Sequence, residues 1–232
     1  GGAQEVRRAG PALADTDPSA IIRIGSLYEP QNLDNTAGAG QGINEAFNDN
    51  VYEALFRLND DGSVVPVLAA DHTVSEDGLT HTFTLREGVK FHSGDPLTAA
   101  DVKYSIERVL AEASKSSRKK SLSTIAGIET PDDGTVVVKL SARSISLPYN
   151  LSYVWIVNDA ATDITGAEDG TGPYVLDGWK RGSAISLKKF DAYWGEAPKN
   201  GGATISYFTE AAALDNALLT DALDLVTTIQ SP

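Results

Sequence analysis

The sequence predicts an α/β protein whose middle section is an antiparallel insertion rich in hairpins. Two patterns carry this prediction: strand and helix signals alternate near both ends of the chain, and paired strands with turn dipeptides fill the stretch between them. Composition supports it, because 41% hydrophobic residues and only 10 prolines in 232 positions are typical of a folded chain with a substantial core. The length allows one or two domains.

The amino-terminal part begins with a stretch that has no periodicity. Residues 1–20 are rich in Gly, Ala, Asp and Pro, and they predict a flexible leader. The β-branched run at 21–25 then predicts a short buried strand. Farther on, apolar residues recur every three or four positions, which predicts one face of a helix: Ile43, Phe47, Val51, Leu55 and Leu58.

Strands and tight turns dominate the middle of the chain. Asp61-Gly62 and Asp77-Gly78 are hairpin dipeptides, and the alternation over 79–85 predicts a half-buried strand. Thr98 and Asp101 form a capping-box pattern that starts a helix ending near Leu110. Strands at 125–129 and 135–140 are joined by a turn at 131–134.

The carboxyl-terminal part returns to mixed elements. Strands are expected at 174–179 and 184–190 as a hairpin, at 204–208, and at 224–228. The Ala- and Leu-rich stretch 210–220 between the last two predicts a helix. No run of about 18 apolar residues occurs, so the sequence predicts no membrane-spanning helix.

Charge and cysteine content exclude several function classes. The net charge of −13 argues against a nucleic-acid partner, which requires a cationic surface. The one basic cluster is interleaved with serine and is interpreted as a solvated loop or helix end: Lys115, Arg118, Lys119 and Lys120. With no cysteine, the chain has no disulfide, no thiolate metal site and no cysteine nucleophile.

Catalytic and cofactor motifs are absent from the sequence. There is no Gly-x-Ser-x-Gly elbow and no Gly-Lys-Ser/Thr phosphate loop, and Gly38-x-Gly40-x-Gly42 lacks the spacing of a dinucleotide loop. His72, His81 and His92 stand nine and eleven residues apart, which favours structural or surface roles over metal binding. We therefore expect no cofactor, no metal site and no enzyme activity.

Aromatic residues gather in one segment. Tyr149, Tyr153 and Trp155 lie in a stretch expected to be extended. Tyr and Trp suit the wall of a ligand cleft because each joins an apolar face to one polar group. An ordinary core strand explains the same residues, and the residues alone favour that alternative.

Several segments together resemble a known family. Residues 75–94 (SEDGLTHTFTLREGVKFHSG) and 96–108 (PLTAADVKYSIER) are similar to the signature of extracellular solute-binding protein family 5, the oligopeptide, dipeptide and nickel class of ABC importers. Shorter matches follow the family's order at 31–34, 51–55, 170–174 and 193–195. The resemblance runs from about Ile21 to Thr228.

The resemblance implies a periplasmic-binding-protein-like lobe of type II with an inserted antiparallel, β-rich subdomain. Residues 21–58 and 165–232 are then the α/β base of the first lobe, and 59–164 are the inserted subdomain. Members of this family are longer, so the chain is expected to be the amino-terminal lobe, with the second lobe absent from it. Lobes of this kind close on a ligand by hinge motion.

In function, the resemblance implies the substrate-binding component of an ABC importer, which captures short peptides between two lobes and delivers them to a membrane permease. Alternatives on the same scaffold are a nickel chelate or an oligosaccharide as ligand, or a receptor that transports nothing; a hydrolase is disfavoured. The implied location is extracytoplasmic. A monomer is expected, and a lipid anchor upstream of Gly1 fits the family.

The resemblance also points to ligand-binding positions. The loop after the first strand borders the ligand in this family, here Ala39, Gly40, Gln41 and Gly42, where glycine allows close approach of a ligand backbone. Cleft side chains are expected from Tyr153 and Trp155. The end of the last strand adds Thr227, Thr228 and Gln230. Residues 75–94, by contrast, are expected to be architectural.

Overall fold

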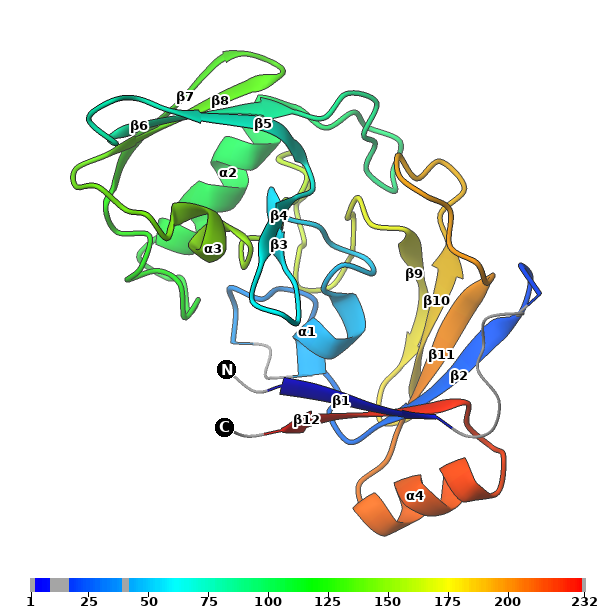
Figure 1. Cartoon of the computed structure of the whole chain (residues 1–232). Coiled ribbons are helices and arrows are strands. Elements are labelled where there is room, and N and C mark those ends of the chain that lie inside the picture. The colour runs from blue at the N-terminus through cyan, green and yellow to red at the C-terminus, as the bar shows by residue number, and fades with distance from the viewer. Residues whose placement is uncertain (1–2, 9–16, 39–41, 231–232) are drawn as a thin grey trace.

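The computed structural model describes residues 3–8, 17–38 and 42–230, which fold into a base and an upper layer (Figure 1). The base holds a six-stranded sheet in the order β1-β12-β2-β11-β10-β9. Strands β2, β11 and β12 run parallel, and the remaining pairs are antiparallel. The strands are β1 (Ala3–Arg8), β2 (Ile21–Ser26), β9 (Tyr174–Lys180), β10 (Ala184–Lys189), β11 (Gly202–Tyr207) and β12 (Leu225–Gln230).

Two helices cover opposite faces of the base sheet. Helix α1 (Gly42–Phe47) buries Ile43 and Phe47 against side chains of β10 and β11. Helix α4 (Ala211–Leu219) buries Leu214 with Val226 of β12 on the other face. Figure 1 shows the two helices above and below the sheet. The base is therefore a mixed sheet with a helix on each side, as an α/β architecture requires.

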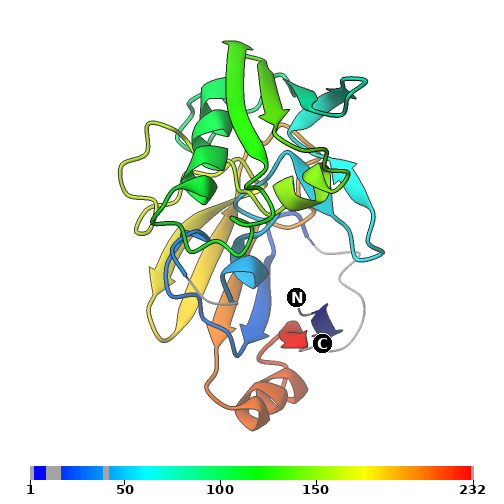
Figure 2. The same cartoon turned by 90° about the vertical axis from the view of Figure 1, so that its left-hand side faces the viewer.

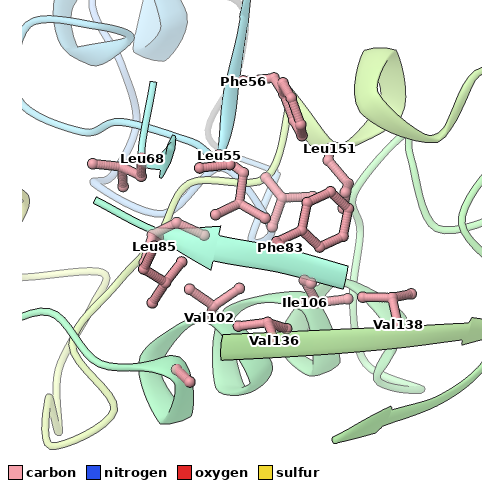
Figure 3. Packing of buried hydrophobic residues seen from close by; sticks show 14 of the residues in the cluster. Leu55, Phe56, Leu68, Phe83, Leu85, Val102, Ile106, Val136, Val138 and Leu151 are labelled. Atoms are coloured by element: carbon pink, nitrogen blue, oxygen red, sulfur yellow. The ribbon is translucent and has the colours of Figure 1, made fainter. Parts of the chain in front are cut away.

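The upper layer is a four-stranded antiparallel sheet in the order β5-β6-β8-β7, with a helix packed under it. Figure 3 shows Phe83 and Leu85, Val136 and Val138, and Val102 and Ile106 of the helix meeting in one apolar core. The elements are β3 (Phe56–Leu58), β4 (Val64–Pro66), β5 (Ala69–Val74), β6 (Thr80–Leu85), α2 (Ala99–Leu110), β7 (Ile125–Asp132), β8 (Thr135–Leu140) and α3 (Leu147–Leu151).

Local sequence signals fix several of these elements. The capping box predicted at Thr98 and Asp101 is present, and α2 begins directly after it. Gly62 and Gly78 have φ angles of 87° and 73°, so the two predicted turns use the left-handed conformation that glycine adopts most easily. The hairpins β7–β8 and β9–β10 also form as predicted.

A junction of backbone and side-chain bonds joins the base to the upper layer. In the segment after α1, the carbonyl of Val51 accepts a hydrogen bond from Gly172 N–H at 2.9 Å. The carbonyl of Glu53 accepts one from Ile156 N–H at 2.9 Å. The buried carboxylate of Glu53 accepts bonds from Thr171 Oγ1 at 3.0 Å, Trp194 Nε1 at 2.9 Å and the Tyr193 hydroxyl at 2.7 Å. These hydrogen bonds therefore join the segment that leads from the base to the upper layer to the segment that returns to the base.

The flexible leader predicted for residues 1–20 is wrong at Ala3–Arg8. These residues form β1, which pairs antiparallel with β12, and the two strands lie side by side in Figure 1 and in Figure 2. Averaging composition over 20 positions hides this short segment, and its pairing partner lies more than 200 residues away. A partner so distant supplies bonds that local composition cannot indicate.

Three further predictions differ from the structure. The helix predicted from Ile43 to Leu58 ends at Phe47, because Asp49 has a φ of 62° and turns the chain. Residues 149–151, the start of the stretch expected to be extended, belong instead to α3, which has a proline in its first turn, a position that favours helix initiation. The strand at 21–25 is only partly buried, since Ile21 is 50% exposed.

No helix within the described ranges is both long and apolar enough to cross a bilayer.

Candidate ligand-binding site

A polar hollow of about 250 Å³ lies beside α1, and we call it the α1 pocket. The turn after α1, the loop at 116–118 and the segment after α3 meet around it. Most of its lining is polar, with amide, hydroxyl and guanidinium groups beside two aromatic rings, so the hollow suits a ligand that forms many hydrogen bonds. The lining residues are Asn35, Asn44, Asn48, Asp49, Arg57, Leu58, Ser116, Ser117, Arg118, Ser152, Tyr153 and Trp155.

Trp155 is held in place from two directions. Its ring stacks on Tyr52 with centroids 4.7 Å apart and an interplanar angle of 8°. Its Nε1–H donates to Asn48 Oδ1 at 2.9 Å. Because only 4% of Trp155 is exposed, it forms the floor of the α1 pocket rather than a free wall.

The loop before α1 is fixed against the same pocket. Asn35 Nδ2 donates to the carbonyl of Tyr153 at 3.2 Å. Asp34 forms an ion pair with Arg108 of α2, and Lys115 N–H donates to the carbonyl of Thr36 at 2.9 Å. These bonds tie the loop at 34–37 to the loop after α2, so two sides of the pocket are positioned together.

Cationic and acidic groups both face the α1 pocket. The guanidinium of Arg118 lies 3.6 Å from the ring centroid of Tyr153. Asp49 is the acidic member, and burial raises its pKa, an effect that the charge of Arg57 partly offsets. The pocket therefore presents two guanidinium groups and one carboxyl group whose ionisation is disfavoured.

A second hollow of about 200 Å³ lies between α1 and the base sheet, and we call it the sheet cavity. Glu45 of α1 reaches into it and accepts a hydrogen bond from Thr227 Oγ1 of β12. Burial raises the pKa of Glu45, although bonds from Ser26 and Thr227 oppose the shift. Apolar side chains make up most of its lining: Ile22, Ile24, Leu187, Ala203 and Ile205.

The structure brings together two of the predicted site residues. Tyr153 and Trp155 both line the α1 pocket. Thr227 lies instead in the sheet cavity. Thr228 and Gln230 lie in β12, but only their backbone is described, and their side chains lie outside the described part of the structure.

The glycine-rich loop gives a different result. Ala39, Gly40 and Gln41 lie outside the described residues. Gly42 is buried at the start of α1, where an added Cβ would stand 2.1 Å from the carbonyl oxygen of Tyr28. Gly42 therefore permits close packing of backbone on backbone, and it is not among the residues that line the α1 pocket.

Sequence reasoning missed the polar members of the pocket. Asn44 and Asn48 are separated by one helical turn on the exposed side of an apolar pattern, which is a signal for a polar face. The sequence pattern predicts that Arg118 is solvated like its lysine neighbours, but it is half-buried against Tyr153. Its separation of 35 residues from Tyr153 concealed this contact.

The histidines have structural surroundings. His72 Nε2 lies 2.9 Å from His81 Nδ1 in the upper layer. His92 is bonded to Glu168 through Nδ1 and to the carbonyl of Gly172 through Nε2 at 2.8 Å. Among the described residues no group of three or more His, Cys, Asp or Glu side chains is placed to hold a metal ion.

An α/β base, an inserted antiparallel sheet and a polar, aromatic pocket beside the first helix define the class of type II periplasmic binding proteins. A family model described as bacterial extracellular solute-binding proteins, family 5, middle, matches residues 63–232. That match covers well over half of the chain. The chain belongs to family 5 of the bacterial extracellular solute-binding proteins.

Individual relatives agree with this assignment. The chain is 34% identical over 210 residues to Protein XP55 of Streptomyces lividans, with 87% of the chain and 37% of that protein covered. It is 33% identical over 200 residues to the glutathione-binding protein GsiB of Salmonella typhi, with 79% and 36% covered. The chain therefore spans little more than a third of the length of these curated relatives.

Solved structures show the same fold. The binding protein AgaA from A. tumefaciens R10, in complex with agropinic acid, matches with a TM-score of 0.84 and 33% identity over 89% of this chain and 43% of that one. The oligopeptide-binding protein AppA from Bacillus subtilis, in complex with a nonapeptide, matches with a TM-score of 0.81 and 23% identity over 89% and 44%. At that lower identity, AppA supports the fold alone.

Proposed function

We propose that the full-length protein is the substrate-binding component of an ABC importer that captures short peptides and delivers them to a membrane permease. The observation that carries the proposal is the α1 pocket, in which Tyr153 and Trp155 stand among amide and guanidinium groups in a chain of this family. Amides and hydroxyls can pair with the main chain of a peptide whatever its side chains are.

The proposal includes the arrangement of the whole protein. The described residues supply one wall of a cleft, and a second lobe, outside this chain, supplies the other. The division into a base (21–58 and 165–232) and an inserted subdomain (59–164) is supported in outline by the separate apolar cores of the two layers. At the bounds the cores differ from it, because Leu55 and Phe56 belong to the upper core and Trp155 and Val157 belong to the base core. The protein works outside the cytoplasm as a monomer, with a lipid anchor upstream of Gly1, and it binds its ligand without catalysis.

A second ligand class has a specific observation in its favour. The structure of AgaA, at 33% identity, holds agropinic acid rather than a peptide. A small organic acid is therefore the alternative ligand on the same scaffold. It fits a pocket with two guanidinium groups as well as a peptide terminus does.

Calorimetric titration of the full-length protein tests the function. Tri-alanine, reduced glutathione and agropinic acid are the ligands, and cello-oligosaccharides and nickel with histidine are the comparisons. We expect tri-alanine or reduced glutathione to bind with micromolar affinity or better and to be recovered unchanged. Binding of agropinic acid alone would favour the alternative ligand. Failure of all three, or hydrolysis of the peptide, would overturn the proposal.

A further inference from the structure

Arg118 differs from the other basic residues of its cluster in where its side chain lies. It is the one member of that cluster that lines the α1 pocket. Lys119 points elsewhere, since its Nζ donates to the carbonyl of Glu112 at 3.0 Å, and Lys120 is exposed. The loop therefore delivers a single cation to the pocket.

Two tyrosines hold the guanidinium of Arg118. Its Cζ lies 3.6 Å from the ring centroid of Tyr153 and 5.4 Å from that of Tyr149. The two rings are 5.5 Å apart at an angle of 71°, and their hydroxyls lie 3.3 Å from each other. Arg118 also forms a side-chain hydrogen bond with Tyr149, so ring contacts and a polar contact together limit the motion of its guanidinium.

Arg118 has no acidic partner within the described ranges. The ion pairs there use Arg23, His92, Lys103, Arg108, Lys139 and Lys188 as cations. The buried Nε of Arg118 has no hydrogen-bond partner at all. A buried donor without a partner is costly, so a site that leaves one is suited to a ligand that accepts a hydrogen bond from it.

The charge balance of the pocket favours an anion. Arg57 and Arg118 line it together with Asp49, whose pKa is raised by burial. The chain as a whole carries a net charge of −13, so a hollow with a cationic excess runs against the general charge. An uncharged oligosaccharide needs no such cation, whereas a planar carboxylate matches the guanidinium fork with two parallel hydrogen bonds.

We propose that Arg118 binds a carboxylate group of the ligand in the α1 pocket, with Tyr149 and Tyr153 fixing the orientation of its guanidinium. This assignment rests on the proposed function and names the ligand chemistry that the amino-terminal side of the cleft recognises. It applies equally to the terminus of a peptide and to a small organic acid. Arg118 acts through contact with the ligand, and the tyrosines act through Arg118.

The first experiment addresses the site alone. In the full-length protein labelled with ¹⁵N, the Arg118 Nε–H signal, assigned by its loss in Arg118→Lys, is followed during titration with sodium acetate and with acetamide at constant ionic strength. We expect acetate to shift this signal in a saturable manner and acetamide to leave it unmoved. Equal effects of the two compounds, or no effect of acetate, would refute the assignment.

The second experiment addresses the ligand. Calorimetry measures the binding of three ligands: tri-alanine, its C-terminal amide and agropinic acid. The proteins compared are the wild type, Arg118→Gln, Arg118→Lys and the matched control Lys120→Gln. Arg118→Gln should bind the carboxylate ligand about 10- to 100-fold more weakly than the wild type, because a charge-assisted pair is lost. The loss should be smaller in Arg118→Lys, and Lys120→Gln should bind as the wild type does. Circular dichroism confirms that each variant is folded.

The outcomes separate this assignment from the function itself. If a carboxylate ligand binds the wild type and Arg118→Gln alike, the assignment is wrong and the binding function stands. If none of these ligands binds the wild type, the proposed function fails, and the acetate titration still decides whether Arg118 is an anion site. The assignment is also refuted if the C-terminal amide of tri-alanine binds the wild type as tightly as tri-alanine does and Arg118→Gln weakens the binding of neither compound.

Discussion

A histidine pair in the upper layer and a glutamate in the base are buried titratable groups whose pKa values shift in opposite directions. The upper layer holds His72 and His81, stacked with ring centroids 5.1 Å apart, and burial lowers the pKa of both. The base holds Glu45 in the sheet cavity, and burial raises its pKa. At both sites burial disfavours the charged form, so the histidine pair and Glu45 respond to pH in opposite directions.

The signs follow from which state binds more protons. A histidine whose folded pKa lies below its ordinary value of 6.5 contributes full stability above that pH, and stability is lost as the pH falls. A glutamate whose folded pKa lies above its ordinary value of 4.5 contributes full stability below that pH, and stability is lost as the pH rises. Acid therefore reduces the stability contributed by the histidine pair and removes the cost of burying a charge on Glu45.

The largest expected effect tests whether the upper layer depends on its apolar core. Phe83 is fully buried and packs on Phe56 and His72 with centroids 5.8 Å and 4.5 Å away. Phe83→Ala should lower the free energy of unfolding by about 3–5 kcal/mol, because it removes a large side chain and leaves a cavity. Urea denaturation measures it. Val74→Ala, at a half-exposed position of β5, is the control and should cost under about 1 kcal/mol.

The next effect concerns the junction between the layers. Glu53→Ala removes the acceptor of three donors, of which Thr171 is buried and Tyr193 and Trp194 are half-buried. It should cost about 2–4 kcal/mol, since a stranded buried donor loses roughly 1–3 kcal/mol unless water reaches it. Glu53→Gln keeps an acceptor for two of the donors and should cost less. Equal urea midpoints for the alanine variant and the wild type would show that the junction does not depend on this carboxylate.

A smaller effect tests the base. Glu45→Gln should raise the free energy of unfolding by roughly 1 kcal/mol at about pH 8, because the variant buries no charge beside Thr227. The gain should disappear at about pH 4, where the wild-type carboxyl is protonated in both states. Thermal unfolding at a series of pH values measures the difference. A gain that is constant with pH would contradict the raised pKa.

The smallest effect tests the upper layer by the same method. His72→Phe keeps an aromatic ring beside Phe83 and removes one of the two bases. The variant should lose less stability than the wild type between about pH 6.5 and 5, because the unfolded chain then has one fewer proton to gain. If both proteins lose stability in parallel over this range, the histidine pair is not the source of acid sensitivity.

Elements with local causes were predictable from the sequence. The helix after Thr98 and the hairpins at Gly62 and Gly78 depend on neighbouring residues, and they form where the patterns indicate. The helix predicted from Ile43 to Leu58 ends at Phe47, because burial of Val51 and Leu55 imitates a helical period while the backbone has already turned at Asp49. Periodicity reports burial and cannot by itself report backbone conformation.

The pocket was only partly predictable for a related reason. Tyr153 and Trp155 stand out by residue type, and family resemblance placed them near a cleft. Arg118 is surrounded in sequence by lysines that contact nothing in the pocket, and its environment comes from α3 and the segment after it. Its surroundings depend on a tertiary contact that spacing does not encode.

The bonds at the junction determine how this part of the protein can move. Gly170 and Gly172 lie so close to the carbonyls of Val51 and Asn50 that an added Cβ would stand 2.0 Å and 2.4 Å away. Two crossing segments pressed together in this way resist twisting, and Glu53 fastens them from within. The base and the upper layer should consequently move as one rigid body, and any hinge motion that encloses a ligand has to occur outside this junction.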